Sequence, residues 1–363
     1  MREYLVCFLV AAAVTYLLTP PVRRLAIRAK AMAEVRDRDI HATPTPRWGG
    51  LAMYGGFLAG LLIASQLPGM TVVFGSNRQP LALVVGSTLI VGLGLLDDRF
   101  GLDAPTKFAG QVLAAGSMAF LGIQMVWLPI GGTLVLDPLT SVLLTVLFVV
   151  LTINAVNFVD GLDGLAAGIV GIAATAFFVY AFLLSVEFGF DRATLAALIS
   201  ALLAGICVGF LPHNVNPARL FMGDTGSMLI GLLLAASAIT LSGRVDPSAV
   251  RGELLLPAIL PLLLPLAVIA VPLVDVGMAV VRRTRRGRSP FAPDKEHLHH
   301  RLIELGHSQR RAVALMYAWT ALIAFSAVAI ALVPWPVALV VFLAGLAGLA
   351  FLVSRPAAAL SRR

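Results

Sequence analysis

The stretch LTINAVNFVDGLDG, Leu151–Gly164, closes an apolar run that begins at Leu139. Such a run suits a membrane-spanning helix, because each helical residue adds about 1.5 Å and the hydrocarbon core of a bilayer measures about 30 Å. Within the stretch, polar side chains follow one another at three-residue intervals: Asn154, Asn157, Asp160 and Asp163. Carboxylates at membrane depth are costly, so the stretch predicts a spanning helix with a functional site at its end.

The same apolar pattern fills most of the chain. Hydrophobic residues make up 59% of its 363 residues, charged residues only 13%, and the mean hydropathy is +0.93. We predict an all-α polytopic integral membrane protein, with one membrane domain covering residues 1–363. Eleven apolar runs are the predicted transmembrane helices: Tyr4–Thr19, Gly49–Gln66, Pro80–Leu96, Thr106–Gln124, Leu139–Ala155, Leu165–Leu184, Ala193–Leu211, Gly226–Leu241, Leu254–Val281, Ala312–Val333 and Val337–Val353.

The distribution of cations predicts the orientation of these helices. With the N-terminus outside and the C-terminus in the cytoplasm, 22 of the 27 Lys and Arg residues fall on the inner side. The carboxylate clusters and all six histidines fall on that side too, so we expect one catalytic face, and it is cytoplasmic. The net charge of +8 suits anionic lipids and anionic substrates. The inner loops that would form this face are 20–48, 97–105, 156–164, 212–225 and 282–311.

Two adjacent carboxylates, Asp97 and Asp98, end the third predicted helix in the segment LLDDRFG. Neighbouring like charges repel one another unless a cation lies beside them. Mg²⁺ takes one or two carboxylates and leaves its other positions to water and substrate phosphates. The pair is therefore a candidate metal or phosphate site, and an ordinary helix end at the membrane interface is the alternative.

The polar residues of the opening stretch offer a second candidate. On a continuous helix Asn154 and Asn157 share a face, while glycines after the helix open the chain around Asp160 and Asp163. Amide and carboxylate oxygens there could bind a metal or the edge of a base. Helix caps and turn formers are the alternative interpretation.

Asp224 stands between two glycines in FMGDTGS, Phe221–Ser227, just before the eighth predicted helix. It could cap the N-terminus of that helix or present a carboxylate to a metal. The glycines would let backbone N–H groups approach a phosphate.

The last long inner loop contains SPFAPDKEHLHHRL, Ser289–Leu302, with His297, His299 and His300. The loop has no thiolate and no His-Glu-x-x-His helix, which argues against zinc. We expect these histidines to donate hydrogen bonds to phosphate oxygens, with Lys295 and Arg301 adding positive charge.

Five ordered segments together resemble the polyprenyl-phosphate N-acetylhexosamine-1-phosphate transferases, a family of multi-helix enzymes. They are PRWGG (46–50), LLDDRFG (95–101), NAVNFVDGLDG (154–164), FMGDTGS (221–227) and PDKEHLHHRL (293–302). The resemblance implies a Mg²⁺-dependent phosphoglycosyltransferase of a bacterial inner membrane, with Mn²⁺ as an alternative ion. A polyprenyl phosphate attacks the β-phosphorus of a UDP-sugar, which releases UMP and leaves a polyprenyl diphosphate sugar. A divalent ion and a basic face suit the meeting of two anionic substrates.

The resemblance also implies roles for individual residues. Asp224 would bind Mg²⁺ directly, with Asn157 and Asp98 around the metal, and Asp97, Asp98, Asp224 and His297 would form the catalytic set. Whether Asp97 or Asp98 acts as a general base stays open, because a phosphate monoester is already mostly dianionic at neutral pH. The remaining substrate-binding residues would be Arg47, Lys107, Asn154, Asp160, Asp163, Lys295, His299, His300 and Arg301.

Within the family, Pro-Arg-x-Gly-Gly and His-Leu-His-His are more similar to the branch that uses UDP-N-acetylglucosamine, for the first step of cell-envelope polysaccharide assembly. The branch using UDP-muramoyl-pentapeptide is the alternative; it has threonine where this chain has Arg47. A secondary transporter would place acids near the midplane within an internal repeat, and the sequence has neither. Expected partners are the UDP-sugar, the polyprenyl phosphate, the membrane and a second copy of the chain, but no nucleic acid.

Overall fold

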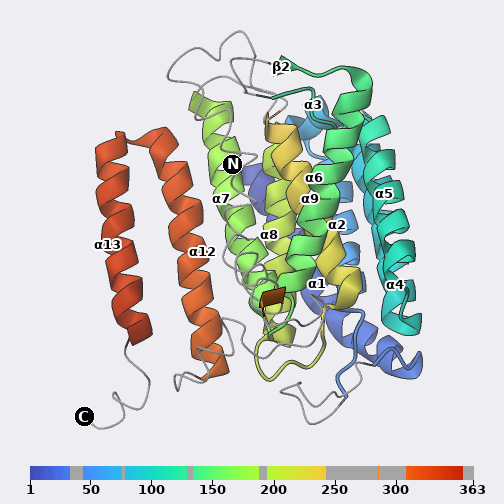
Figure 1. Ribbon diagram of the computed structural model, residues 1–363. Coiled ribbons are helices and arrows are strands. Elements are labelled where there is room, and N and C mark those ends of the chain that lie inside the picture. The colour runs from blue at the N-terminus through green and yellow to red at the C-terminus, as the bar shows by residue number, and fades with distance from the viewer. Residues whose placement is uncertain are drawn as a thin grey trace.

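The computed structural model describes residues 1–32, 44–75, 78–128, 134–187, 194–242, 284–285 and 308–354. Long helices run side by side through the molecule (Figure 1). Their bounds are α1 Arg2–Arg28, α2 Gly49–Ala64, α3 Thr71–Phe74, α4 Gln79–Phe100, α5 Ala104–Phe120, α6 Pro138–Val159, α7 Leu165–Glu187, α8 Thr194–Asn214, α9 Gly223–Ser242, α12 Gln309–Leu332 and α13 Trp335–Ser354. A short 3₁₀ turn, Pro68–Met70, precedes α3. Two short antiparallel strands, β1 Trp127–Leu128 and β2 Leu134–Val135, join α5 to α6.

The all-α polytopic architecture is confirmed. Eight of the described helices, namely α1, α4, α6, α7, α8, α9, α12 and α13, are long and apolar enough to cross a membrane. A ninth span is formed if α2 and the segment after it, bent by 99°, count together. Helix α5, with 17 residues, coincides with the predicted span Thr106–Gln124. The predicted span Leu254–Val281 lies outside the described residues, so the number eleven and the orientation stay predictions.

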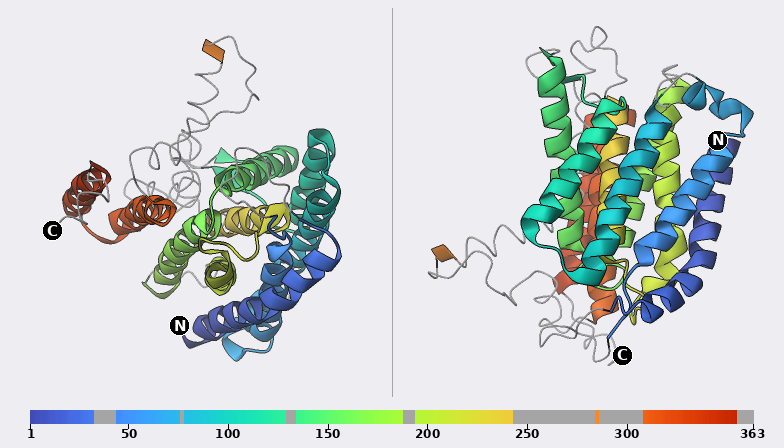
Figure 2. Two further views of the ribbon diagram at one scale, coloured as in Figure 1. Left: turned by 90° about the horizontal axis from the view of Figure 1, so that it is seen from below. Right: turned by 90° about the vertical axis from the view of Figure 1, so that its right-hand side faces the viewer.

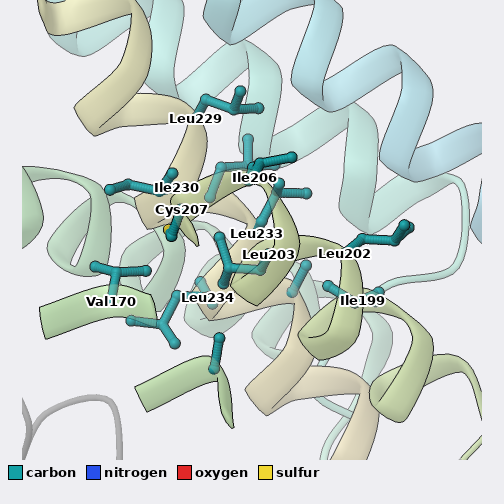
Figure 3. Packing of buried hydrophobic residues seen from close by; sticks show 14 of the residues in the cluster. Val170, Ile199, Leu202, Leu203, Ile206, Cys207, Leu229, Ile230, Leu233 and Leu234 are labelled. Atoms are coloured by element: carbon teal, nitrogen blue, oxygen red, sulfur yellow. The ribbon is translucent and has the colours of Figure 1, made fainter. Parts of the chain in front are cut away.

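Helix α9 lies at the centre of the bundle (Figure 2, left). Every residue of its apolar window is buried, against 11% of the window in α13. Figure 3 shows Leu233 and Leu234 of α9 among Leu203 and Ile206 of α8 and Val170 of α7. Since lipid tails are as apolar as leucine, close van der Waals packing of this kind, and not exclusion from water, holds such helices together.

Glycines allow the neighbouring helices to approach the start of α9 closely. A Cβ on Gly50 of α2 would lie 2.2 Å from the backbone nitrogen of Gly226, and one on Gly94 of α4 would lie 2.4 Å from the Cα of Thr225. No side chain fits at either position. The first turn of α9 therefore lies in close backbone contact with both the start of α2 and the end of α4.

Helices α12 and α13 form a hairpin at the edge of the bundle, where α12 packs against α7 (Figure 1). Much of α13 is exposed, including Trp335, Val340 and Phe351. These apolar side chains would face lipid, which explains why a helix so little buried in protein is so apolar.

Candidate active site

The described polar residues that the sequence singled out come from helix ends that meet at one end of the bundle, the lower end in Figure 1. Helices α4, α6 and α8 end there, whereas α5, α7, α9 and α12 begin there. The segment before α2 pairs with the segment before α9: Phe221 N–H donates to the Pro46 carbonyl at 2.9 Å, and Gly49 N–H donates to the Phe221 carbonyl at 3.0 Å. Two of the five ordered sequence segments thus lie side by side.

Four side chains from four helices form what we call the reactive cluster: Asp97, Lys107, Asn157 and Asp224. The ammonium of Lys107 lies between two carboxylates, 2.7 Å from Asp97 Oδ2 and in direct contact with Asp224 Oδ2. Asn157 Nδ2 donates to Asp224 Oδ1 at 3.1 Å and to Ser227 Oγ at 2.9 Å. Two acids therefore share a single ammonium, and among the described residues no second cation pairs with Asp97 or Asp224.

Asp98 does not join this cluster, although it is the next residue after Asp97. Its carboxylate accepts hydrogen bonds from the backbone N–H groups of Asp224 and Thr225, at 2.9 and 3.1 Å, and from Thr225 Oγ1 at 2.7 Å. It caps the N-terminus of α9 from another helix, where the helix dipole favours a negative charge. Gly223 is the first residue of α9 and has a φ of +70°, and a Cβ there would lie 2.3 Å from Asp98 Oδ2.

This cap revises two of the possibilities that the sequence left open. Asp224 does not cap its own helix, because it lies in the first turn of α9 and its N–H donates to Asp98. Between the two glycines, the backbone N–H groups of Asp224 and Thr225 already donate to the Asp98 carboxylate. Arg47 lies close to this cap, with Nη1 4.0 Å from Asp98 Oδ1.

The donor set of the reactive cluster fits Mg²⁺. This ion binds one or two carboxylates together with waters and substrate oxygens, and it does not need a cage made only of protein groups. Asp97 and Asp224 are two such carboxylates, already close enough to share one ammonium, and a divalent cation would relieve their repulsion. Among the described residues, no group of three or more His, Cys, Asp or Glu side chains converges as a ready-made metal cage.

Asn154 lies deeper in the bundle than the cluster. Its Nδ2 donates to Gln111 Oε1 at 2.7 Å and to the Val150 carbonyl at 2.8 Å. The amide N–H groups of Asn154 thus serve contacts within the protein.

A second set of polar side chains, which we call the anchor network, surrounds the turn between α6 and α7. It consists of Asp163, Asn214 and Asn216. Asp163 Oδ2 accepts from Asn216 Nδ2 at 2.9 Å and from the backbone N–H of Ala218 at 3.1 Å. Asn214 Oδ1 accepts from the Gly164 N–H at 3.0 Å, and its Nδ2 donates to the Leu220 carbonyl at 3.0 Å. The network ties this turn to the loop that leads into α9.

Helix α12 is bound to the same network. Both Nε and Nη2 of Arg310 donate to the Asn216 carbonyl, at 2.9 and 2.7 Å, and Asn216 Nδ2 donates to Gln309 Oε1 at 2.7 Å. Two turns farther along α12, the Tyr317 hydroxyl donates to the Gly164 carbonyl. The start of α12 thus packs on the turn that carries Asp160 and Asp163.

Asp160 is half-buried at the end of α6, just outside the spanning segment. Loss of solvation raises its pKa to about 8, and the nearby negative charges of Asp224 and Asp98 act in the same direction. Its carboxyl therefore holds a proton near neutral pH as long as no cation balances these acids.

Of the nine predicted site residues in the described part of the chain, five lie in the two sets: Asp97, Lys107, Asn157 and Asp224 in the reactive cluster and Asp163 in the anchor network. His297, His299, His300, Lys295 and Arg301 lie outside the described residues, so their predicted contact with phosphate stays a prediction. Sequence reasoning did not find Gln111, Thr225, Asn214, Asn216 or Tyr317. A glutamine within an apolar run and a cluster of amides in HNVNPAR were signals that could have pointed to three of them.

The fold and this site define a polytopic α-helical membrane protein whose charged groups meet where several helices end. The family model described as glycosyl transferase family 4 matches residues 80–242. A decaprenyl-phosphate N-acetylglucosaminephosphotransferase of Mycolicibacterium smegmatis is 49% identical over 332 residues, which cover 90% of this chain and 82% of the relative. The protein of the same name from Mycobacterium tuberculosis is 47% identical over the same shares of the two chains.

A phospho-N-acetylmuramoyl-pentapeptide-transferase of Desulforudis audaxviator is 32% identical over 364 residues, covering 94% of this chain and 98% of the relative. The chain belongs to glycosyl transferase family 4, and it is a membrane-embedded enzyme of the transferase type. The resemblance seen in the five ordered segments is thereby confirmed.

Proposed function

We propose that this chain transfers N-acetylglucosamine 1-phosphate from UDP-N-acetylglucosamine to a polyprenyl phosphate, giving polyprenyl diphosphate-N-acetylglucosamine and UMP. The names and the identity of the mycobacterial relatives support the two substrates. The observation that carries the proposal in the structure is the reactive cluster, where Lys107 and two acids meet at the end of a membrane bundle. We place this end at the cytoplasmic face of a bacterial inner membrane, because the Lys and Arg residues favour that side.

In this reaction one phosphorus–oxygen bond forms and another one breaks. An oxygen of the polyprenyl phosphate bonds to the β-phosphorus of the UDP-sugar, and the bond from that phosphorus to the oxygen bridging to the α-phosphate breaks. UMP leaves with the electron pair. The attacking phosphate monoester has a second pKa of about 6, so it is already mostly dianionic at neutral pH. A protein base is therefore not needed, and we assign Asp97 and Asp98 to positioning.

Mg²⁺ would be held by Asp224 and Asp97, with Asn157 beside them. When bound, the ion would neutralise phosphate charge and orient the two substrates. Asp98, which the sequence placed around the metal, is engaged at the N-terminus of α9, so the geometry favours Asp97 as the second carboxylate.

Lys107 brings a positive charge into the reactive cluster. Its ammonium contacts both Asp97 and Asp224, so it lies within the cluster. A phosphate oxygen that enters the cluster would find this donor in place. We propose that Lys107 neutralises the transferred phosphate, while Asp98 keeps the first turn of α9 and hence Asp224 in position.

Radiolabel transfer by the purified full-length protein in lipid nanodiscs tests the proposal. Polyprenyl phosphate and Mg²⁺ are supplied with labelled UDP-N-acetylglucosamine or UDP-muramoyl-pentapeptide. We expect label to enter lipid only from the first donor, and to be lost with EDTA and in Asp224→Asn. Ser237→Ala, in the distant half of α9, should behave as the unchanged protein. Transfer from the second donor alone would overturn the donor assignment, and transfer unaffected by Asp224→Asn would overturn the site.

A further inference from the structure

A second layer of side chains joins three of the four helices of the reactive cluster, one turn farther into the bundle. We call it the inner layer: Gln111 of α5, Asn154 of α6 and Met228 of α9. Asn154 Nδ2 donates to Gln111 Oε1 at 2.7 Å, and Gln111 Nε2 lies 3.5 Å from Met228 Sδ. Gln111 is only 3% exposed. The two amides thus bind each other in the interior of the bundle.

The spacing along the helices couples the two layers. Residues three or four apart share a face of an α-helix and lie one above the other. Gln111 follows Lys107 by four residues, and Asn154 precedes Asn157 by three. A shift or rotation of α5 against α6 that breaks the inner amide pair therefore also moves Lys107 and Asn157 relative to each other.

We infer that Gln111 is a positioning residue for the proposed transfer reaction. Its hydrogen bond to Asn154 sets α5 against α6, so that Lys107 from one helix and Asn157 from the other both reach Asp224. The inference rests on the proposed function and adds to it a residue that never touches substrate.

The chemistry of the pair explains why it can fix a register. An amide buried in a bundle without a partner is costly, because no water is there to replace the lost hydrogen bond. The Gln111 and Asn154 side chains satisfy each other in one relative placement of the two helices, whereas apolar side chains would pack acceptably in several. Asn157 has a short side chain and contacts Asp224 at 3.1 Å. If α6 moved, this side chain could not extend far enough to keep the contact.

Gln111→Met is the variant that tests this role, since methionine keeps the length and volume of glutamine but cannot bind the amide. We expect kcat to fall by about tenfold, because small misplacements of positioned groups have effects of this order or larger. The KM for UDP-N-acetylglucosamine should not change. The matched control is Ser237→Ala, which removes a buried bond between α8 and α9, Ser200 Oγ to Ser237 Oγ at 2.6 Å, far from the cluster. The control should keep kcat.

A double-mutant cycle and an exchanged pair separate positioning from general destabilisation. The loss in Gln111→Met with Asn154→Ala should equal that of the more damaging single change, because either change already removes the bond between Gln111 and Asn154. The exchange Gln111→Asn with Asn154→Gln restores an amide pair of the same combined length and should recover kcat. Additive losses without recovery in the exchange would overturn the inference.

Acylation of Lys107, followed by mass spectrometry, gives a readout that does not depend on activity. A loosened cluster should expose the ammonium, so acetic anhydride should modify Lys107 faster in Gln111→Met than in the unchanged protein or in Ser237→Ala. Unchanged modification together with unchanged kcat would overturn the inference. Absence of transfer by the unchanged protein would instead overturn the proposed function, and the modification rates would still decide the role of Gln111.

Discussion

The reactive cluster and the anchor network both place aspartates at the same end of the bundle, yet they treat the negative charge differently. In the cluster, Asp97 and Asp224 share the ammonium of Lys107, and the Asp224 and Lys107 side chains keep 23% and 28% of their surface exposed. In the anchor network, Asp163 accepts hydrogen bonds from the Asn216 amide and from the backbone N–H of Ala218, and it is only 6% exposed.

The difference indicates which acids are available to a ligand. A carboxylate already bound by backbone and amide donors gains little from a cation, whereas two carboxylates sharing one ammonium gain much. We therefore interpret the cluster as the place where substrate phosphates and a metal meet, and the anchor network as the support that holds the surrounding loops.

The largest effect on kcat is expected in the reactive cluster, and it should distinguish the cluster from the anchor network. Asp224→Asn should lower kcat for transfer by about 10²–10³-fold, because it removes a charge that acts on the reacting phosphates. Asp163→Asn should lower kcat far less and act mainly through a lower melting temperature, since Asp163 binds the Asn216 amide and the Ala218 N–H of the protein. Steady-state kinetics with labelled UDP-N-acetylglucosamine would measure both. Equal losses of kcat in the two variants would show that the reactive cluster and the anchor network do not differ in this way.

Asp98→Asn should show that not every acid beside the cluster serves a ligand. Asparagine cannot supply the second carboxylate oxygen, so charge-assisted bonds to Thr225 and the start of α9 are lost at a cost of about 1.5–3 kcal/mol. Thermal unfolding in detergent would measure it. Asp103→Asn is the control, because Asp103 caps α5 on the exposed surface through Thr106 N–H at 3.0 Å and should cost less. A larger effect at Asp103 would contradict the assignment of Asp98 as a structural cap.

Asp160 should make the stability of the metal-free protein depend on pH. Its pKa is raised from 3.8 to about 8, so between these values the folded protein holds a proton that the unfolded chain releases. The contribution to stability is present below the ordinary pKa and is lost as the pH rises through about 8. In EDTA, Asp160→Asn should remove this decline and raise the melting temperature at the alkaline end. An unchanged pH profile of the melting temperature would show that Asp160 is already ionised.

The smallest effect, a loss of stability, should come from removing a hydrogen bond between α12 and the turn between α6 and α7. Tyr317→Phe removes one hydrogen bond to the Gly164 carbonyl but keeps the ring, so we expect a loss of about 0.5–1.5 kcal/mol in stability. Tyr54→Phe, which loses an exposed bond to Thr88 Oγ1 at 2.6 Å, is the control and should change less. Similar losses in both variants would show that α12 does not stabilise the turn specifically.

Much of the fold was predictable because the bilayer imposes a length on each apolar run. Ten of the eleven predicted spans overlap described helices, of which eight are long and apolar enough to cross a membrane. Most ends differ by a few residues, but α1 continues past Thr19 to Arg28. The two predicted spans on either side of NFVDGLDG, for example, correspond to α6 and α7, and the chain turns at Asp160–Gly164 as its glycines indicated. Charged residues could be assigned to helix ends for the same reason, since charge is costly within the hydrocarbon.

The arrangement of these helices was not predictable from their composition. An apolar residue facing lipid and one facing protein look alike in the sequence, so nothing marked α9 as the centre and α13 as the edge. The partners of Asn154 were hidden too, because Gln111 lies 43 residues away in the chain and only the packing of α5 on α6 brings them together.

Asp97 and Asp98 show most clearly what each level of structure decides. The sequence by itself determined that two carboxylates end a membrane helix beside other acids and cations, and that Asp224 follows a glycine at the start of another helix. Which of the two carboxylates faces Lys107 was decided only by the tertiary structure. Consecutive side chains on a helix point about 100° apart. Gly94 lets α9 approach α4 from one direction, which turns Asp98 to the helix N-terminus and leaves Asp97 to the cluster.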